Sequence, residues 1–353
     1  MTLRTIIIQA ALLLTVVTAQ AQRTNNNGPF VRGIYQNRVN PDDPVRQAKP
    51  GILIIGTGEN IRVVSAFSGN SKGGMAYTNA VNNYRKRLGD TIRIYSMVIP
   101  IASQYYTPLS AQNLSVDEKS TLDGMYARLV DVKGIDVYTP LGMHADEHIY
   151  LRTDHHWAPL GAYYAAEAFA KEAGVPFHDL SWYDKKTIHN FLGTMYSVYT
   201  KDPEVGKAPE DFDYYVPRNV KYTTTAITYR LGKKRQTVGQ NAPKEVSFFR
   251  NYGDGNGAAY CTFMGGDANT TKVVTSTKNG RKLMIIKDSY GNAIPGYLFY
   301  SFEEIHVLDF RYFPNNVITY VKENGITDIL FAHCISLAYA QATGVGLQKM
   351  LDR

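Results

Sequence analysis

The feature that most constrains the fold is an alternation of short apolar runs with segments of helical periodicity from residue 50 onward. A short apolar run that ends at glycine or proline is typical of a buried strand, and apolar residues at helical spacing indicate a helix. Strands are expected at residues 51–56, 92–99, 135–139, 282–286, 305–308 and 326–331, and helices at 77–88, 115–129, 162–173, 292–302 and 316–324. This alternation predicts an α/β fold with a mostly parallel sheet covered on both faces.

Residues 180–280 break the alternation. They contain turn-rich, alternating runs, such as residues 222–229, and a glycine-rich loop at 253–257. Alternating runs bounded by turn residues are typical of short strands. We therefore expect an inserted β-rich subdomain or lid within a main domain that covers residues 50–353.

The N-terminus has the pattern of an export signal. Arg4 supplies a short basic region, residues 6–17 form an apolar run too short to span a bilayer comfortably, and Ala19-Gln20-Ala21 forms a small-residue cleavage site. An uncleaved anchoring helix is the alternative. Residues 1–21 are thus predicted to be a signal peptide cleaved after Ala21, residues 22–49 an arm or linker, and the mature protein an exported, periplasmic one.

The charge of the chain argues against one class of partner, and its cysteines leave two redox states open. The formal charge of +7 is mild for 353 residues, and the basic residues are scattered without interleaved aromatics, which argues against a nucleic-acid partner. The two cysteines, Cys261 and Cys334, could pair in an oxidising compartment or remain free thiols, because spacing alone does not decide between these states.

Titratable side chains are concentrated in residues 152–162, directly before a predicted helix. Asp154 and His156 lie two positions apart, so in extended chain they share one face, whereas His155 is expected to point to the opposite side. A carboxylate beside an imidazole fixes its tautomer and favours its protonated form. A buried Asp–His pair that only satisfies hydrogen bonds in the turn is the alternative.

A hydroxyl group occurs at a strand-to-helix turn. Ser289 follows the strand predicted at 282–286, and ligands of such sheets bind at the carboxyl ends of the strands. The turn also directs backbone N–H groups at a developing oxyanion, which we expect from Ser289 and Tyr290 with help from the Asn292 side chain. Our hypothesis is that Asp154, His156 and Ser289 form a nucleophilic triad; helix capping is the alternative role of the serine.

Two further groups of residues have open roles. His144, Asp146, Glu147 and His148 precede the central stretch and could join Asp154 and its neighbours in a metal site, although no known zinc spacing is matched. Tyr105 and Tyr106, shortly after a predicted strand, could line a sugar site or simply pack.

Residues 153–163 resemble the signature of the bacterial DHHW protein family, as do shorter stretches at 95–100, 191–196, 287–290 and 309–312. That family is similar to the SGNH-like domains of the periplasmic alginate O-acetylation proteins, which carry an Asp-x-His-Trp motif and, much later, a nucleophilic serine. The resemblance implies that Asp154 is the acid, His156 the base and Ser289 the nucleophile, with His155 on the variable position. In one departure, Lys287 stands where ordinary SGNH hydrolases have a glycine.

The resemblance implies an SGNH-hydrolase-like three-layer fold and an O-acetyltransferase or acetylesterase that acts on an exported polysaccharide. Such a triad requires neither a cofactor nor a metal. A membrane-bound acyl-carrier protein is an open partner. The alternative functions are a non-catalytic polysaccharide-binding or assembly factor and a metal-dependent hydrolase.

Overall fold

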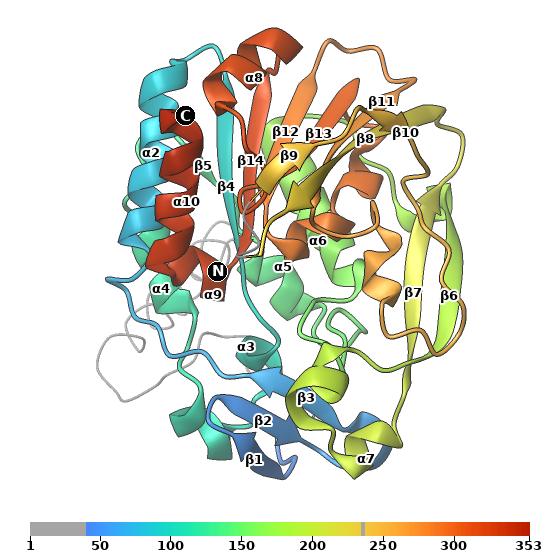
Figure 1. Cartoon of the computed structure of the whole chain (residues 1–353). Coiled ribbons are helices and arrows are strands. Elements are labelled where there is room, and N and C mark those ends of the chain that lie inside the picture. The colour runs from blue at the N-terminus through green and yellow to red at the C-terminus, as the bar shows by residue number, and fades with distance from the viewer. Residues whose placement is uncertain (1–39, 234–236) are drawn as a thin grey trace, which may run out of the picture.

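The computed structural model describes residues 40–233 and 237–353, which surround a nine-stranded sheet (Figure 1). The strands run in the order β10-β8-β11-β13-β12-β14-β4-β5, and β9 pairs with β8. Their bounds are β4 Arg93–Ile99, β5 Lys133–Gly134, β8 Tyr222–Leu231, β9 Thr237–Gln240, β10 Lys244–Glu245, β11 Asn269–Thr275, β12 Lys282–Lys287, β13 Glu304–Asp309 and β14 Asp328–Cys334.

The sheet is mixed rather than mostly parallel. Strands β13, β12, β14, β4 and β5 are parallel neighbours, whereas β11, β8, β10 and β9 pair in antiparallel fashion. Strands β8, β9, β10 and β11 all come from the region 180–280. Strand β11 joins them to the parallel strands through its antiparallel pairing with β13. The expectation of a mostly parallel sheet was wrong because that region extends the sheet instead of folding apart from it.

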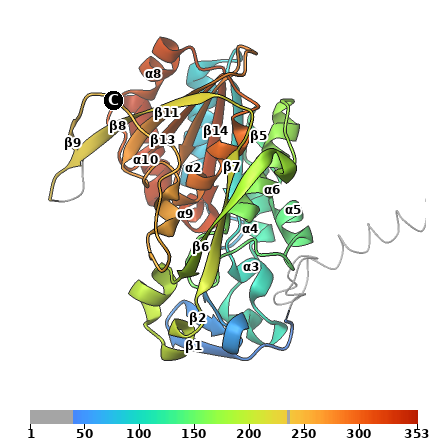
Figure 2. The ribbon, with the colours of Figure 1, turned by 90° about the vertical axis from the view of Figure 1, so that its right-hand side faces the viewer.

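Helices cover both faces of the parallel strands (Figure 2). The Tyr95 ring of β4 packs on Phe169 of α6 (Pro159–Ala173) at a centroid distance of 5.2 Å. The next residue, Ser96, hydrogen-bonds the Tyr77 hydroxyl of α2 (Met75–Leu88) at 3.0 Å. Because successive side chains of a strand point to opposite faces, α2 and α6 lie on opposite sides of the sheet.

Helix ends follow the sequence signals. Pro159 occupies the first turn of α6, where its missing N–H has no intrahelical partner to lose, and Gly174 ends the helix in the left-handed region at φ 63°. Gly89, at φ 71°, similarly ends α2. The predicted helices at 77–88, 162–173 and 316–324 are confirmed, the last as α8 (Val317–Asn324).

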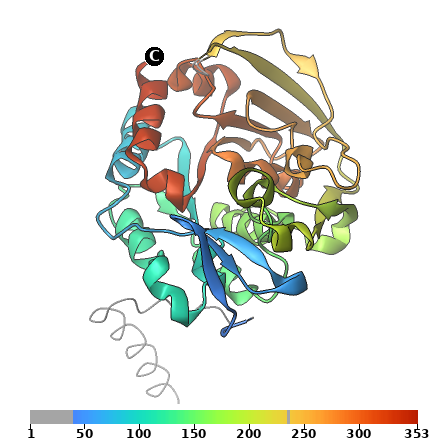
Figure 3. The same cartoon turned by 60° about the horizontal axis from the view of Figure 1, so that its bottom comes forward.

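Other predicted elements differ. Residues 51–56 contain β2 (Ile52–Ile55), which belongs to a separate antiparallel sheet with β1 (Val45–Lys49) and β3 (Arg62–Ser65) because a turn at Gly51, φ 76°, folds β1 back onto it (Figure 3). The strand expected at 135–139 does not form there: the two-residue strand β5 ends at Gly134, and helix α5 (Tyr138–Met143) begins at Tyr138. Residues 292–302 contain the 3₁₀ segments η6 (Ser289–Ala293) and η7 (Pro295–Leu298), since Pro295 cannot continue a hydrogen-bonded α-helix.

The helix expected at 115–129 begins late, as α4 (Lys119–Tyr126). The Glu118 N–H, which a capping box would direct to Ser115, donates instead to the Gln104 side chain at 2.8 Å. The Ser115 hydroxyl accepts a hydrogen bond from the Phe67 N–H at 3.0 Å, and the Glu118 carboxylate accepts one from the Ile101 N–H at 3.0 Å. These long-range contacts tie the segment to the chain that follows β3 and to the chain that follows β4.

The region 180–280 is rich in strands, as expected, but it is not one separate subdomain. Strands β6 (Tyr183–Phe191) and β7 (Glu210–Pro217) form a two-stranded sheet, and between them lie the π-helix η4 (Met195–Thr200) and α7 (Pro203–Gly206). Strands β8 and β11 extend the main sheet.

The remaining helical segments are α3 Ser103–Tyr106, α9 Ile335–Tyr339, α10 Gln341–Asp352, η1 Gly58–Asn60, η2 Leu109–Leu114, η3 Leu180–Trp182 and η5 Ala259–Thr262. Helix α10 packs beside α2, where the Tyr84 hydroxyl donates to the Leu347 carbonyl oxygen at 3.1 Å. Across residues 40–233 and 237–353, every helix is too short or too polar to span a membrane. The predicted signal peptide and most of the predicted arm lie outside the described residues. Cys261 and Cys334 are free thiols.

Candidate active site

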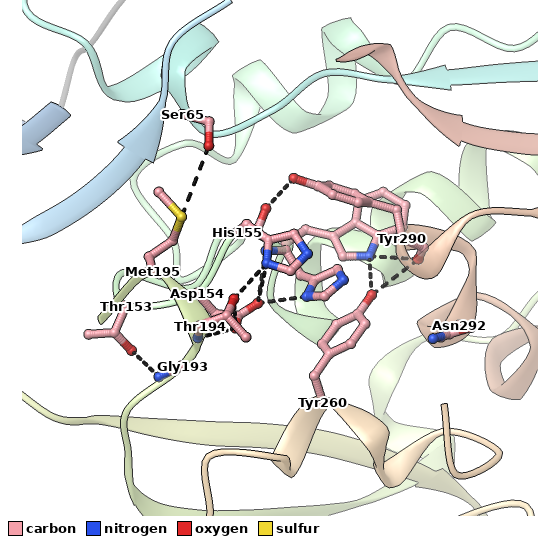
Figure 4. A network of polar contacts seen from close by, with 12 residues as sticks. Ser65, Thr153, Asp154, His155, Gly193, Thr194, Met195, Tyr260, Tyr290 and Asn292 are labelled. Carbon is pink, nitrogen blue, oxygen red and sulfur yellow. Dashed lines mark hydrogen bonds and ion pairs between the residues drawn. The ribbon is translucent and has the colours of Figure 1, made fainter. Parts of the chain in front are cut away.

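Two distant stretches meet at the carboxyl end of β12. Residues 151–156 form a tight loop that an antiparallel bridge between Tyr150 and Trp157 closes. The buried Trp157 indole N–H donates to the Tyr290 carbonyl oxygen at 3.0 Å. Because Tyr290 directly follows Ser289, this bond joins the histidine loop to the serine turn, as the sequence analysis expected (Figure 4).

Asp154 and His156 form a buried acid–imidazole pair. Asp154 Oδ1 lies 2.6 Å from His156 Nδ1 and also accepts the His156 backbone N–H at 3.0 Å. A carboxylate only accepts hydrogen bonds, so Nδ1 carries the proton and Nε2 carries the lone pair. Burial alone would raise the pKa of Asp154, but the neighbouring imidazoles and the hydrogen bonds hold it well below its usual range. The pair is therefore an ionised carboxylate with an imidazole of defined tautomer.

The second oxygen of Asp154 is held by a chain segment from the region 180–280. Thr194 donates both its backbone N–H, at 2.7 Å, and its hydroxyl, at 2.8 Å, to Asp154 Oδ2. Gly193 allows this approach, because a Cβ atom there would lie 2.3 Å from the Cβ of Asp154. Sequence reasoning gave neither residue a role, although the stretch 191–196 carried the signal as part of the family resemblance.

A buried carboxylate anchors the start of the loop. Glu210 Oε1 accepts the Thr153 N–H and hydroxyl, both at 2.7 Å, and Oε2 accepts the Arg152 N–H at 2.8 Å. The Thr153 hydroxyl oxygen in turn accepts the Gly193 N–H at 3.0 Å. Glu210 thus fixes the backbone of the two residues that precede Asp154, and no local sequence pattern pointed to it.

The second ring nitrogen of His156, Nε2, has an unusual environment. Nε2 is a buried atom without a hydrogen-bond partner among the described residues. The ring is stacked on Tyr260, with centroids 3.8 Å apart and planes 7° apart. A buried acceptor without a partner is costly, and such atoms call for a functional or solvent explanation. A lone pair held in this way can accept a proton from a reacting hydroxyl group.

Ser289 begins η6 and is half-buried. The preceding residue, Asp288, fixes the turn: its carboxylate accepts the Tyr290 N–H at 2.9 Å and the Cys334 N–H at 2.8 Å. Burial raises the pKa of Asp288 to about 6. Within the described part of the chain, Ser289 Oγ and His156 Nε2 are not joined by a hydrogen bond, so the structure brings the two loops together without closing a serine–histidine contact.

Lys287 lies in a buried charge network beneath this turn. Its ammonium group is 2.9 Å from Asp267 and 3.1 Å from Asp309. Arg311 bonds the same two carboxylates at 2.9 and 2.6 Å, and the Asn292 amide donates to Asp267 at 2.8 Å. Burial opposes the charge on Lys287, but the two carboxylates raise its pKa above the ordinary value.

The other residues expected at the site are the oxyanion donors and two tyrosines, and they lie in different surroundings. The Tyr290 N–H, expected to face an oxyanion, is engaged by Asp288. Asn292 is buried beside the turn, and its amide oxygen has no partner among the described residues.

Tyr105 and Tyr106 are buried: the Tyr105 hydroxyl donates to the Tyr138 carbonyl oxygen at 2.9 Å, and the Tyr106 ring lies under a guanidinium group. Both tyrosines pack in the core, so the sugar-binding alternative for them was wrong.

His155 does not point away from the site. Its ring lies 3.8 Å from the His156 ring, because residues 152–156 form bends rather than extended chain and the two-residue alternation does not apply. Its Nδ1 lies 2.6 Å from Thr194 Oγ1. The expectation that His155 faces the opposite side was therefore wrong.

The larger metal cluster does not assemble. His144 Nδ1 lies 2.5 Å from Glu147 and its ring stacks on Tyr164, while His148 Nε2 lies 2.9 Å from Glu210. In the described ranges, the one group of three candidate ligands within 4.8 Å of one another consists of Asp154, His155 and His156. The hydrogen bonds among those three and Thr194 already occupy both carboxylate oxygens.

A family model described as DHHW protein matches residues 57–308. The crystal structure of a DHHW family protein from Eubacterium siraeum is similar to this chain at 36% identity and a TM-score of 0.78, covering 88% of this chain and 98% of that one. The structure of Bacillus cereus PatB1 with a sulfonyl adduct is similar at 17% identity and a TM-score of 0.61, covering 84% and 97%. The O-acetyltransferase domain of Pseudomonas putida AlgJ is a looser match, at 12% identity and a TM-score of 0.43, covering 87% and 99%. The search of curated proteins found no match.

Proposed function

The chain belongs to the DHHW protein family, and we propose that it is an acyl-transfer enzyme in which Ser289 is the nucleophile, His156 the base and Asp154 the orienting acid. The observation that carries the proposal is the buried, partnerless Nε2 of an imidazole whose tautomer a carboxylate fixes. The turn with Ser289 lies next to it through the bond between Trp157 and Tyr290.

The proposed reaction has two steps. First, Ser289 Oγ gives its proton to His156 Nε2 and attacks the ester carbonyl carbon of the donor. The bond from that carbon to the leaving oxygen breaks, the leaving oxygen takes the proton from Nε2, and an acyl-serine remains. The Ser289 N–H and the Asn292 side-chain amide are the proposed donors to the oxyanion.

In the second step, water or a sugar hydroxyl attacks the acyl-serine and gives its proton to His156 Nε2. The bond between the acyl carbon and Ser289 Oγ breaks, and Oγ takes the proton back. Water as the attacking group makes the protein an esterase, whereas a sugar hydroxyl makes it an O-acetyltransferase. Asp154 keeps its charge and stabilises the imidazolium throughout.

We further propose an exported, periplasmic protein with an SGNH-like three-layer fold that acts on a cell-surface or extracellular polysaccharide. The family resemblance and the pattern of residues 1–21 support this proposal. A membrane-bound acyl-carrier protein is the partner that would deliver acyl groups from the cytoplasm. The fold shared with PatB1, whose structure contains a sulfonyl adduct, is compatible with a nucleophilic site. A non-catalytic polysaccharide-binding role is the runner-up.

The test compares wild-type protein with Ser289→Ala and with Ser71→Ala, an exposed serine as the matched control. We expect Ser289→Ala to lower turnover of a chromogenic acetyl ester by about 10³-fold or more with its circular dichroism unchanged. A sulfonyl fluoride should label Ser289 in the mass spectrum, and prolonged chelation should leave the activity unchanged. A fully active Ser289→Ala variant would refute the triad, and activity lost on chelation and restored by zinc would favour the metal-dependent alternative.

A further inference from the structure

A small cavity of about 130 Å³ lies against the serine turn. His155 and Asp154 line one part of it, Tyr290 and Cys334 another, and Tyr199 of the π-helix η4 its edge. Tyr290 follows Ser289, and the Cys334 N–H binds the residue that precedes Ser289. The cavity is small and open to solvent, so part of a sugar, such as a hydroxyl group, can enter it.

Hydrogen bonding fixes which nitrogen of His155 is protonated. The Thr194 hydroxyl has one hydrogen, which it donates to Asp154 Oδ2 at 2.8 Å. Thr194 Oγ1 must therefore accept from His155 Nδ1, 2.6 Å away, so Nδ1 carries the proton. Nε2 of His155 is left as a hydrogen-bond acceptor.

The His155 side chain, which carries this acceptor, is more exposed than that of His156. Its side chain is 37% exposed, and no described residue bonds its Nε2, whereas the His156 side chain is 9% exposed. The Tyr290 hydroxyl donates to the His155 carbonyl oxygen, which fixes the backbone there. Burial and the neighbouring His156 lower the pKa of His155 to about 4, so the ring stays neutral at physiological pH.

Building on the proposed function, we propose that His155 is a substrate-binding residue whose Nε2 accepts a hydrogen bond from a hydroxyl group of a carbohydrate acceptor. The centroids of the two histidine rings lie 3.8 Å apart, so a sugar that binds at His155 lies beside the ring of the proposed base. One hydroxyl binds His155, and the other gives its proton to His156 as it attacks the acyl-serine. The exposed Tyr199 ring, at the cavity edge, offers the flat surface on which a sugar ring packs.

This arrangement favours transfer over hydrolysis. The neutral Nε2 of His155, beside the base, binds hydroxyl groups. A sugar with two hydroxyls is held by both histidines, whereas a water molecule is held by one. The bond to His155 is made by the second substrate alone. Its loss should therefore lower transfer to a sugar relative to hydrolysis of the same acyl-serine.

Two substitutions separate the two nitrogens of His155. The amide of His155→Asn reaches the position of Nδ1 and can keep the contact with Thr194, but nothing replaces Nε2. The amide of His155→Gln reaches the position of Nε2 and supplies an oxygen acceptor there. His155→Phe keeps the stacking ring and lacks both nitrogens, and His189→Asn, at an exposed histidine paired with Asp211, is the matched control.

The experiment uses a chromogenic acetyl ester as donor, with methyl glucoside or methanol as acceptor, and quantifies acetylated product and free acetate. For His155→Asn and His155→Phe we expect the ratio of glucoside transfer to hydrolysis to fall about tenfold, the cost of one hydrogen bond. Both products come from the same acyl-serine, so the ratio does not depend on how fast a variant forms that intermediate, and His155→Gln should recover most of the glucoside transfer. Transfer to methanol, which has one hydroxyl, should be unaffected.

The outcomes distinguish this inference from the proposed function. A wild-type ratio in folded His155→Asn or His155→Phe, or a wild-type protein that forms acyl-Ser289 but never acetylates the glucoside, would overturn the role of His155 while the triad stands. Absence of acyl-Ser289 in the wild type would remove the proposed function itself, and this inference with it.

Discussion

Adding one methyl group at Gly193 tests whether the position of Asp154 controls the reaction. In Gly193→Ala the new Cβ would lie 2.3 Å from Asp154 Cβ, 2.6 Å from Asp154 Oδ2 and 2.8 Å from Asp154 Cα. Ordinary contact begins at 3.4 Å, so the two segments must separate by 3.4 − 2.3 = 1.1 Å. The displaced atoms belong to a side chain with both oxygens hydrogen-bonded and to adjacent backbone, so neither side can yield by rotating a flexible end.

The displacement predicts losses in rate and in stability. A misplacement of about 1 Å in a catalytic constellation costs about 10²-fold in rate, and we expect kcat for a chromogenic acetyl ester to fall by this factor with KM little changed. Overpacking a filled site should lower the free energy of unfolding by about 1–3 kcal/mol. The control is Gly253→Ala, because a Cβ at Gly253 has no neighbour within 4 Å.

The assay measures initial rates at a temperature where circular dichroism shows each variant to be fully folded, together with thermal unfolding. A folded Gly193→Ala variant with a wild-type rate would show that the position of Asp154 does not matter to turnover. An equal loss in Gly253→Ala would show that any added methyl group in this region disturbs the enzyme.

Two further predictions concern the acid and its neighbour. Asp154→Asn keeps the base but removes the support for its tautomer and its charged form, so turnover of the acetyl ester should fall by up to about 10⁴-fold, and an unchanged rate would refute the role of the acid. The pKa of His155 is lowered to about 4 by burial and by His156, below that of the unfolded chain, so the folded state binds fewer protons. Its contribution to stability is present above about pH 6.5 and is lost as the pH falls towards 4. The midpoint temperature of thermal unfolding, measured between pH 7.5 and pH 4, should therefore fall more steeply with decreasing pH in wild type than in His155→Asn. Parallel curves for the two proteins would contradict the lowered pKa.

Local patterns predicted the elements whose signals are local. Apolar runs and glycine stops located the strands β4, β12, β13 and β14 and the helices α2, α6 and α8 to within a few residues. The order of the strands in the sheet, by contrast, depends on which chain segments pair across long distances. Strand β11 pairs with β8 and β13 through backbone hydrogen bonds, which any extended segment can make. The sequence therefore could not place the region 180–280 at the edge of the main sheet.

The site divides in the same way. Asp154, His156 and Ser289 stand out because their residue types and motifs are local, and the structure brings their two loops together. The supports of the acid come from elsewhere in the chain: Thr194 lies 40 positions and Glu210 57 positions from the residues they bind. The error over His155 has a related cause, since the alternation argument holds only for extended chain and the loop is held in bends by those distant contacts.

The contacts of Lys287 show how the turn accommodates a lysine at the position where the family resemblance led us to expect a glycine. The lysine is buried, and a lone ammonium group there would be costly, but two carboxylates and the Arg311 guanidinium give the network two positive and two negative charges. Gly291 leaves room for the lysine, because a Cβ at Gly291 would lie 2.5 Å from the Cβ of Lys287. The lysine also places Asp267, which holds the amide of Asn292. One buried side chain thus connects β12 and β13 to the turn that carries Ser289.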